Sequence, residues 1–308
     1  MTIEINSLTK RLGKQCVIND FSFSAKRQEC LGLFGADGTA KTTLFKMIAG
    51  STAPSSGHVH ILGFDTRTQR RQACQAVGYQ PAEFSHPTLS VSSLLNFIAT
   101  LRGFRGADKR RRLDRATARL ELSPLLKHPI STLPAGLKRK VAIAQATLHD
   151  PCVLLLDEPC EGLAPHQHLM IRALIQSLTE EMTVIIASRD CEAWADTCTR
   201  GLIVEGGRLL ADLPMPDLLR SSRHFQAVTL ASESTLDLLA LAVLPGVAGI
   251  EEDHHRPDTV TVLAMPGHSI FPSIIALIAH RHWHVHSLKL EPGRLKDVVH
   301  HWSQGAPL

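Results

Sequence analysis

Apolar residues in the first two hundred positions form two kinds of segment, which alternate along the chain. Short continuous apolar runs bounded by glycine or polar residues predict buried strands over residues 29–35, 57–62, 152–157 and 183–188. Segments in which apolar residues recur every three or four positions predict helices over residues 41–49 and 137–148. A Gly206-Gly207 turn predicts a hairpin over residues 201–208. Alternating strands and helices are typical of an α/β domain.

The pattern changes between about residues 84 and 135, where helix-like segments follow each other without an intervening strand. Residues 91–101 and 109–120 both have helical spacing, and arginines occupy the outer face of the second segment. We therefore expect a small helical subdomain, inserted into the α/β domain at about residues 84–135.

Beyond residue 220 the predicted strands and helices are shorter. In order, they are a strand (225–231), a helix (235–243), two strands (247–254 and 259–265), a helix (269–280), a strand (282–291) and a last amphipathic helix (295–302). The βαββαβ order predicts a small ferredoxin-like α+β extension. The sequence thus predicts two domains, residues 1–220 and residues 221–308.

Composition and charge narrow the class of protein. The chain has 308 residues, of which 44% are apolar and 20% charged, as in ordinary globular proteins of about two domains. A formal charge of +4 gives no reason to expect a nucleic-acid partner. No run reaches the ~20 apolar residues of a membrane-spanning helix, and the N-terminus lacks the apolar stretch of a secretory signal. We expect a cytoplasmic protein.

The segment 35–43, GADGTAKTT, lies between a predicted strand and a predicted helix. In such a loop, backbone N–H groups and the helix N-terminus point at a phosphate group. Lys41 adds a positive charge, and the Thr42 hydroxyl can bind Mg²⁺. The segment departs from the pattern G-x-x-x-x-G-K-[ST] at Ala40, which replaces the second glycine. The candidate nucleotide-binding residues are Gly35, Ala36, Asp37, Gly38, Thr39, Ala40, Lys41, Thr42 and Thr43.

A second segment strengthens the prediction of a nucleotide site. Residues 153–159, VLLLDEP, form an apolar strand that ends in two carboxylates. Asp157 would reach Mg²⁺ through water, and Glu158 would be the catalytic base that orients and deprotonates the attacking water. The alternative is a buried strand followed by two surface acids. Together the two segments predict ATP and Mg²⁺ as cofactors.

With both segments in place, the chain resembles the ATP-binding subunits of ABC transporters, in the bacterial exporter branch whose permeases are separate polypeptides. Four stretches resemble the family, at residues 8–35, 77–104, 133–165 and 289–302. The resemblance implies a P-loop NTPase core with a helical subdomain, and a head-to-tail pair with a second ABC ATPase, either identical or different. It also implies an integral-membrane permease docked beside residues 82–104, and hence a peripheral location on the inner face of the cell membrane.

Several positions depart from the family's catalytic motifs. The departures are Leu12 for an adenine-stacking aromatic, Ala40 for a glycine, Ala82 for a Mg²⁺- and water-binding glutamine, Pro134 for the signature serine, Ala135 for a glycine, Ala164 for an aspartate and Arg189 for the switch histidine. These changes affect both the P-loop side and the signature side of a shared site. We therefore expect slow or impaired hydrolysis. The alternative is a regulatory or scaffold subunit that does not hydrolyse ATP.

Histidines are concentrated near the C-terminus, where ten of the 17 lie after residue 221. His282, His284 and His286 alternate along a predicted strand, so their side chains would share one face. The paired histidines at 254–255 and 300–301 would add nearby imidazoles. Such a group suits Zn²⁺, Cu²⁺ or Ni²⁺. The alternative is a solvated sheet face that is rich in histidine.

Overall fold

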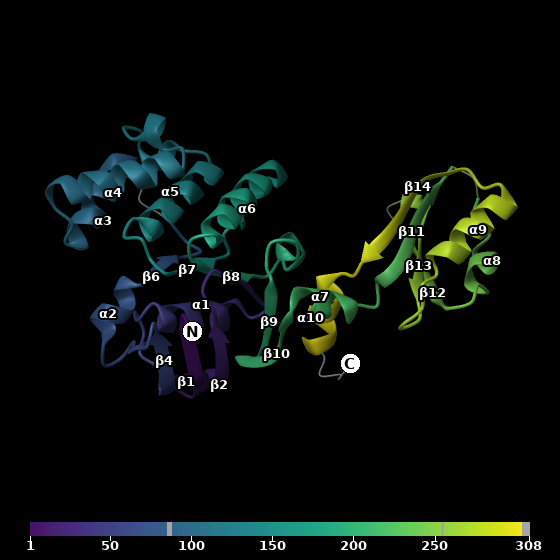
Figure 1. Cartoon of the computed structure of the whole chain (residues 1–308), viewed down its shortest axis with the longest axis horizontal. Helices are drawn as coiled ribbons and strands as arrows, with labels where there is room; N and C mark the ends of the chain where they lie inside the picture. The colour runs from purple at the N-terminus through teal and green to yellow at the C-terminus, as the bar shows by residue number, and fades with distance from the viewer. Residues whose placement is uncertain (85–87, 234, 254–255, 304–308) are drawn as a thin grey trace. The chain divides into compact units, whose positions relative to one another are not determined.

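The structure, a computed structural model, describes residues 1–84, 88–233, 235–253 and 256–303 and divides the chain into two compact units (Figure 1). The N-terminal unit is Met1–Asp212, and the C-terminal unit is Leu213–Leu308. The division falls before the predicted boundary at residue 220. Helix α7 (Met215–Arg220) packs against the last helix, α10 (Leu295–Ser303), and so it belongs to the C-terminal unit.

Strands and helices alternate through the N-terminal unit, which confirms the α/β class. The strands are β1 (Ile3–Leu12), β2 (Gln15–Ala25), β3 (Cys30–Phe34), β4 (Ser56–Ile61), β5 (Phe64–Asp65), β6 (Val77–Gln80), β7 (Val153–Asp157), β8 (Thr183–Ser188), β9 (Arg200–Glu205) and β10 (Arg208–Pro214). The helices are α1 (Gly38–Ile48), α2 (Arg70–Gln75), α3 (Val91–Leu101), α4 (Gly106–Arg119), α5 (Ala135–Thr147) and α6 (Pro165–Thr179). Short 3-10 turns lie at η1 (Ser123–Leu125), η2 (Ile130–Thr132) and η3 (Glu192–Trp194).

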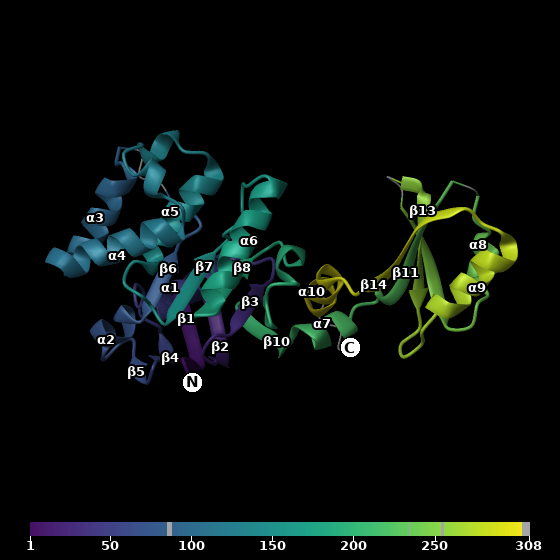
Figure 2. The same cartoon turned by 45° about the horizontal axis from the view of Figure 1, so that its top comes forward.

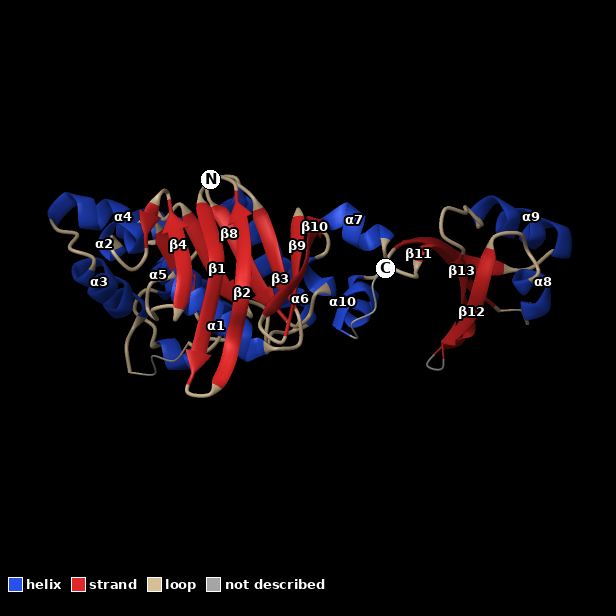
Figure 3. Cartoon of the chain, turned by 90° about the horizontal axis from the view of Figure 1, so that it is seen from below, coloured by secondary structure: helices blue, strands red, loops and turns tan. Residues whose placement is uncertain are grey.

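Two sheets organise the N-terminal unit. An antiparallel sheet has the strand order β2-β1-β4-β5, and Figure 3 shows β1, β2 and β4 side by side. The other sheet has the order β10-β9-β3-β8-β7-β6, in which the strands from β9 to β6 run parallel. Because parallel strands end at the same edge of a sheet, the segments that follow β3, β7 and β8 are neighbours.

One apolar cluster joins the two sheets through helix α1. Phe45 and Ile48 of α1 belong to the same buried cluster as Ile5 of β1 and Leu155 of β7. Burying an aliphatic or aromatic side chain of this size contributes about 1.5–3 kcal/mol relative to leaving it exposed. This packing holds the N-terminal end of α1 at the edge of the parallel sheet.

Helices α3, α4 and α5 lie together in the blue and teal part of the chain, at one side of the parallel sheet (Figures 1 and 2). Ala99 of α3, Ala116 of α4 and Leu148, directly after α5, form a small buried cluster. The guanidinium of Arg112 lies 4.3 Å from the centre of the Phe104 ring, a cation–π contact that links α4 to the end of α3. Among the described residues, no helix has the length and apolar content needed to cross a membrane.

The C-terminal unit contains a four-stranded antiparallel sheet with two helices on one face (Figures 1 and 2). Its elements after α7 are β11 (Phe225–Ser232), α8 (Leu238–Ala242), β12 (Val247–Asp253), β13 (Arg256–Ala264), α9 (Phe271–Arg281), β14 (Val285–Pro292) and α10. The strand order is β12-β13-β11-β14, and a core that includes Val228, Leu230 and Ile274 lies between sheet and helices. The βαββαβ order is the one that the sequence predicts; the name ferredoxin-like stays a prediction.

Candidate functional site

The carboxyl ends of β3, β7 and β8 bring the predicted nucleotide-binding segments together. β8 lies between β3 and β7 in the sheet, and all three strands run parallel. The loop 35–43 follows β3, Asp157 ends β7, and Ser188 ends β8. Residues that are far apart in the sequence therefore face one edge of the sheet, where ligands bind in open α/β sheets.

The loop after β3 leads directly into α1 and has the backbone that an anion site requires. Asp37 is the N-cap of α1, and its Oδ1 accepts from the Ala40 N–H at 3.0 Å. A Cβ atom at Gly38 would meet no other atom within 4 Å. A Cβ atom at Gly35 would lie 1.9 Å from the Val204 carbonyl oxygen, so only glycine fits at position 35. The Ala40 methyl group is fully buried in the core. The extra methyl group at position 40 is therefore accommodated inside the protein.

Lys41 is buried at the N-terminal end of α1. Its Nζ donates to the carbonyl oxygens of Gly35 at 2.5 Å and Ser188 at 3.0 Å, and it lies 3.8 Å from Glu158 Oε1. Burial lowers the pKa of the Lys41 ammonium, and the negative charge of Glu158 opposes that shift. The Lys41 ammonium thus lies between the loop, the end of β8 and the two acids at the end of β7.

Thr42 and Asp157 form the hydroxyl–carboxylate pair that the sequence predicts as the Mg²⁺ site. Thr42 Oγ1 donates to Asp157 Oδ2 at 2.7 Å, and the Tyr79 hydroxyl donates to the same oxygen at 3.2 Å. Burial raises the pKa of the Asp157 carboxyl, and burial beside this acid raises the pKa of Tyr79. Hydroxyl and carboxylate oxygens are ligands that Mg²⁺ prefers, so this pair fits the ion.

Glu158, the candidate catalytic base, is paired with Arg189. Arg189 Nε lies 3.5 Å from Glu158 Oε1, and the Arg189 backbone N–H donates to Oε2 at 3.3 Å. Burial raises the pKa of the Glu158 carboxyl, while Lys41 and Arg189 oppose the shift. Glu158 also has a φ of +46°, a conformation that non-glycine residues rarely adopt. Its Oε1 is buried without a hydrogen-bond partner among the described residues.

The remaining departures from the family's motifs lie at exposed or half-buried positions. Leu12 is 52% exposed at the end of β1, so it presents apolar surface but no ring. Ala82 and Ala164 are half-buried, and Pro134 and Ala135 are exposed at the start of α5. Pro134 provides no side-chain cap for α5, a role that a serine fills well.

Three residues at this site were not predicted from the sequence. Tyr79 and Gln80 end β6, beside β7, and the Gln80 amide donates to the Asp157 carbonyl oxygen at 3.3 Å. Arg139 of α5 donates to the carbonyl oxygens of Ala82 at 3.2 Å and Glu161 at 3.3 Å. β6, with only four residues, gives little periodic signal in the sequence, and its place beside β7 appears only in the structure. No signal in the sequence marks Arg139 either.

The premise of the transition-metal hypothesis is wrong. β14 begins at Val285, so His282 and His284 precede the strand, and only His286 lies on it. His282 is the C-cap of α9 with a φ of +53°, which breaks the alternation on which the hypothesis rested. Residues 254–255 lie outside the described residues. In the part of the chain that the structure describes, no group of three or more His, Cys, Asp or Glu side chains can hold a metal ion.

Comparison with known proteins gives consistent matches. The sequence model of the ABC transporter family matches residues 18–161. The chain is 32% identical over 223 residues to the probable multidrug ABC transporter ATP-binding protein YbhF of Escherichia coli, with 72% of this chain but only 39% of YbhF covered. It is 32% identical over 221 residues to the Nod factor export ATP-binding protein I of Rhizobium etli, covering 70% of this chain and 69% of that protein.

The fold has equally clear relatives among solved structures. The structure of cbiO1 from Clostridium perfringens, part of the ABC transporter complex cbiONQ, superposes with a TM-score of 0.63 at 25% identity. The match covers 71% of this chain and 91% of cbiO1.

Proposed function

Because the chain belongs to the ABC transporter family, among its ATP-binding proteins, we propose that it binds Mg·ATP and couples that binding to an integral-membrane permease. One observation carries the proposal: the Thr42 hydroxyl and the Asp157 carboxylate are 2.7 Å apart, at the edge of the sheet where buried Lys41 meets the loop 35–43. In this arrangement Lys41 and the loop N–H groups bind phosphate oxygens, and Thr42 and Asp157 hold Mg²⁺. Held by Thr42 and Asp157, the ion would neutralise phosphate charge.

Nucleotide binding is tested by calorimetry with Mg·ATP. Lys41→Ala should abolish binding, because it removes the buried cation that faces the phosphates. Lys46→Ala is a matched control: Lys46 lies on the same helix but is exposed, so that variant should bind like the unchanged protein. Equal binding by the unchanged protein and by Lys41→Ala would contradict the proposal.

We further propose that hydrolysis is slow, because the guanidinium of Arg189, which also pairs with Glu161, lies beside Glu158. A general base must accept a proton, and a guanidinium 3.5 Å away stabilises its ionised form and competes for its oxygen. Arginine also cannot act as a neutral donor, unlike histidine. Together with Ala82 and Pro134, this arrangement supports the alternative of a regulatory subunit that binds ATP without turning it over.

The hydrolysis proposal is tested by restoring the missing groups. Ala40→Gly, Ala82→Gln, Pro134→Ser and Arg189→His together should raise ATP turnover by orders of magnitude, since each lost donor to a developing charge is worth ~10²–10³ in rate. Any one change alone should help little, because the other defects still limit the rate. Turnover by the unchanged chain of about one per second or faster, abolished by Glu158→Gln, would show that the site is already competent.

The proposed permease dock is the segment 82–104, of which residues 85–87 lie outside the described residues. Within it, α3 exposes Phe97 and Leu101, which are 55% and 68% exposed and lie one helical turn apart. Apolar side chains exposed in this way suit contact with an apolar partner surface. The proposal places the chain on the inner face of the membrane, paired with a second ATPase through the exposed start of α5.

The dock is tested by co-purification with the permease. Phe97→Asp and Leu101→Asp should release the chain from membranes while leaving its thermal unfolding unchanged. Leu169→Asp on α6 is the matched control, since Leu169 is 66% exposed and lies outside the segment. Unchanged co-purification of the α3 variants would count against this dock.

A further inference from the structure

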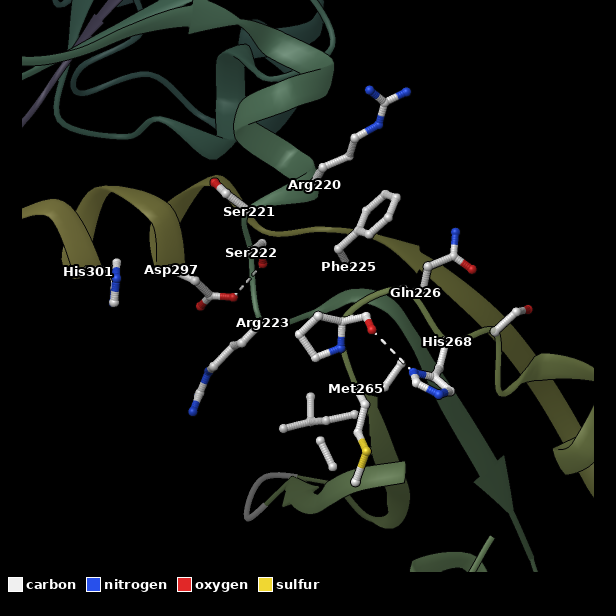
Figure 4. A pocket seen from close by; sticks show the side chains of 16 residues that line it. Arg220, Ser221, Ser222, Arg223, Phe225, Gln226, Met265, His268, Asp297 and His301 are labelled. Carbon is white, nitrogen blue, oxygen red and sulfur yellow. Dashed lines mark hydrogen bonds between the residues drawn. The ribbon is translucent and has the colours of Figure 1, made fainter. Parts of the chain in front are cut away.

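The cavity in the C-terminal unit does not bring its polar side chains together at one point. Its volume is about 870 Å³, and all of its lining residues belong to this unit. In Figure 4 the side chains of Arg220 and Arg223 point away from each other, and His301 lies apart from both. Among the residues that line this cavity, the donors therefore do not converge on one ligand. A pair of thiols in the N-terminal unit does converge.

Cys30 and Cys198 bring two thiols into contact in the interior of the N-terminal unit. Their Sγ atoms are 3.9 Å apart, although 168 positions separate the two residues in the sequence. Both side chains are buried, with exposed fractions of 1% and 4%. Both are free thiols. The fold thus places two oxidisable groups side by side that the sequence keeps far apart.

The parallel pairing of β3 with β9 sets this contact. Cys30 is the first residue of β3, and Leu31 pairs with Arg200 of β9. The backbone N–H and the side-chain hydroxyl of Thr199 both donate to the Cys30 carbonyl oxygen, at 2.9 and 3.0 Å. Cys198 directly precedes Thr199. These hydrogen bonds therefore hold Cys198 beside Cys30, just before β9 begins.

The backbone geometry at this contact suits a disulfide bond. Neighbouring strands lie ~4.8 Å apart, and the Cα atoms of disulfide-bonded cysteines are ~4.4–6.8 Å apart. A disulfide bond is ~2.05 Å long, so the two sulfur atoms have to approach each other by about 2 Å from their separation of 3.9 Å. Rotation about the side-chain torsions of the two cysteines provides an approach of this size while the strands stay paired.

The two thiols differ in reactivity. The hydrogen bond between them lowers the pKa of the Cys30 thiol, because the Cys198 thiol donates to the Cys30 thiolate, and burial opposes that shift. The same hydrogen bond, together with burial, raises the pKa of the Cys198 thiol. Cys160 provides a contrast, because burial raises its pKa to about 11. Since the thiolate is the reactive form, Cys30 is the nucleophile of the pair.

We propose that Cys30 and Cys198 form a redox-sensitive pair, which hydrogen peroxide converts into a disulfide that fastens the start of β9 to β3. The Cys30 thiolate attacks one oxygen of the peroxide, which breaks the O–O bond, releases hydroxide and leaves a sulfenic acid. The Cys198 thiol then attacks the Cys30 sulfur, which breaks the S–O bond and releases water. In total, two thiols lose two electrons and two protons, and one peroxide becomes two water molecules. A thiol reductant reverses the change.

The position of the bond determines what it does to the N-terminal unit. Cys30 lies at the end of β3 that is remote from the loop 35–43, so the bond does not enter the nucleotide site. Because a cross-link between distant residues restricts the unfolded chain strongly, the oxidised unit should resist unfolding better than the reduced unit. The pair is thus a redox-dependent stabilising element, and its test does not depend on ATP binding.

The first test maps the bond in the whole chain. The chain is treated with hydrogen peroxide, the remaining thiols are blocked in denaturant, and the protein is digested without reductant for mass spectrometry. A peptide pair joined through Cys30 and Cys198 is expected, and dithiothreitol should separate it. Cys160→Ala is the matched control, because Cys160 is also buried, with 7% exposed, and this variant should form the same linked pair. Absence of the linked pair after peroxide treatment would overturn the proposal.

The second test measures thermal unfolding of the N-terminal unit by calorimetry. Peroxide should raise the Tm of the unchanged chain by about 5 °C, and dithiothreitol should reverse the rise. Cys30→Ala and Cys198→Ala, each of which removes one thiol, should show no rise, and the use of two variants covers the case in which one does not fold. An equal rise in these variants, or no rise in the unchanged chain, would show that the pair does not fasten β9 to β3.

Discussion

The two units of the chain bury their polar groups in opposite ways. In the N-terminal unit, Lys41, Asp157 and Glu158 gather at the edge of a parallel sheet, and Glu158 Oε1 is left without a hydrogen-bond partner in the described chain. In the C-terminal unit, both ring nitrogens of His224 face carboxylate oxygens. The polar cluster of the N-terminal unit leaves a carboxylate oxygen without a hydrogen bond, as expected of a site that takes a ligand. The contact around His224 leaves no ring nitrogen unpaired, as expected of a structural contact.

The difference shows how a buried polar group indicates its role. Charged groups cost free energy when buried, so they persist where partners or a ligand compensate for them. In the C-terminal unit the atoms without a partner among the described residues, His301 Nε2 and Trp302 Nε1, lie outside the His224 contact. In the N-terminal unit, Gln80 Oε1, His149 Nδ1 and Glu158 Oε1 lack a partner among the described residues, and the last of these belongs to the predicted base itself. Three predictions sharpen this comparison.

The largest effect is expected for His224→Leu. The substitution leaves the half-buried carboxylates of Asp297 and Glu251 without their imidazole partner, and each lost hydrogen bond to a charged group is worth about 1.5–3 kcal/mol. The C-terminal unit should unfold at lower temperature while the N-terminal unit keeps its transition. Differential scanning calorimetry, with hydrogen exchange to assign the transitions, provides the measurement. A single unshifted transition would show that the contact is not structural.

A second prediction concerns the pH dependence of the N-terminal unit. Burial, with a smaller contribution from Arg102, lowers the pKa of His149 from 6.5 to about 4, and its Nε2 lies 3.0 Å from the Val77 carbonyl oxygen. Because the unfolded chain binds the proton more readily, the stability of the folded unit falls as the pH drops from about 6.5 towards 4. The total loss is on the order of 3 kcal/mol.

His149→Gln tests this assignment, because glutamine keeps a donor for the Val77 carbonyl but does not titrate. Urea unfolding of the N-terminal unit at a series of pH values should give a flatter stability profile for the variant between pH 6.5 and 4. An equally steep profile in both proteins would mean that another group carries the dependence.

The smallest effect is expected for Tyr79→Phe. The variant loses the hydrogen bond from the hydroxyl to Asp157 Oδ2, which is worth about 1 kcal/mol of stability. Affinity for Mg·ATP should change less than threefold, because Thr42 still contacts the same carboxylate. Thr147→Val, which also removes one hydroxyl hydrogen bond in this unit, is the control for stability alone. A much larger loss of affinity would make Tyr79 a ligand-binding residue.

The sequence by itself determined the elements whose signals are local. The apolar runs predicted β7 and β8 within one residue of their ends, and helical spacing predicted α3 at residues 91–101. The glycine-bearing loop before Lys41 predicted a strand–loop–helix, and Asp37 caps that helix as expected for its residue type. Gly206 and Gly207 have φ of +54° and +73°, which makes a tight hairpin turn predictable from composition.

Other features depended on contacts between distant segments. The β1–β2 hairpin and α6 were not predicted, although both are long, and β6 is too short to give a periodic signal. His282 ends α9 in a left-handed conformation, so the predicted strand of alternating histidines begins only at Val285. A three-residue difference in where the strand begins therefore takes two of the three histidines off the strand.

Tertiary structure also decided the partners of each functional group. The glycine-bearing loop and the strand 153–157, taken together, marked Lys41, Asp157 and Glu158 in the sequence. The neighbours Tyr79, Arg139 and Arg189, and the paired thiols of the N-terminal unit, come from segments brought together by packing. Local sequence patterns determine which side chains are present at a site. The pKa values and contacts of those side chains depend on distances and burial, which are defined only once the sheets and helices have packed.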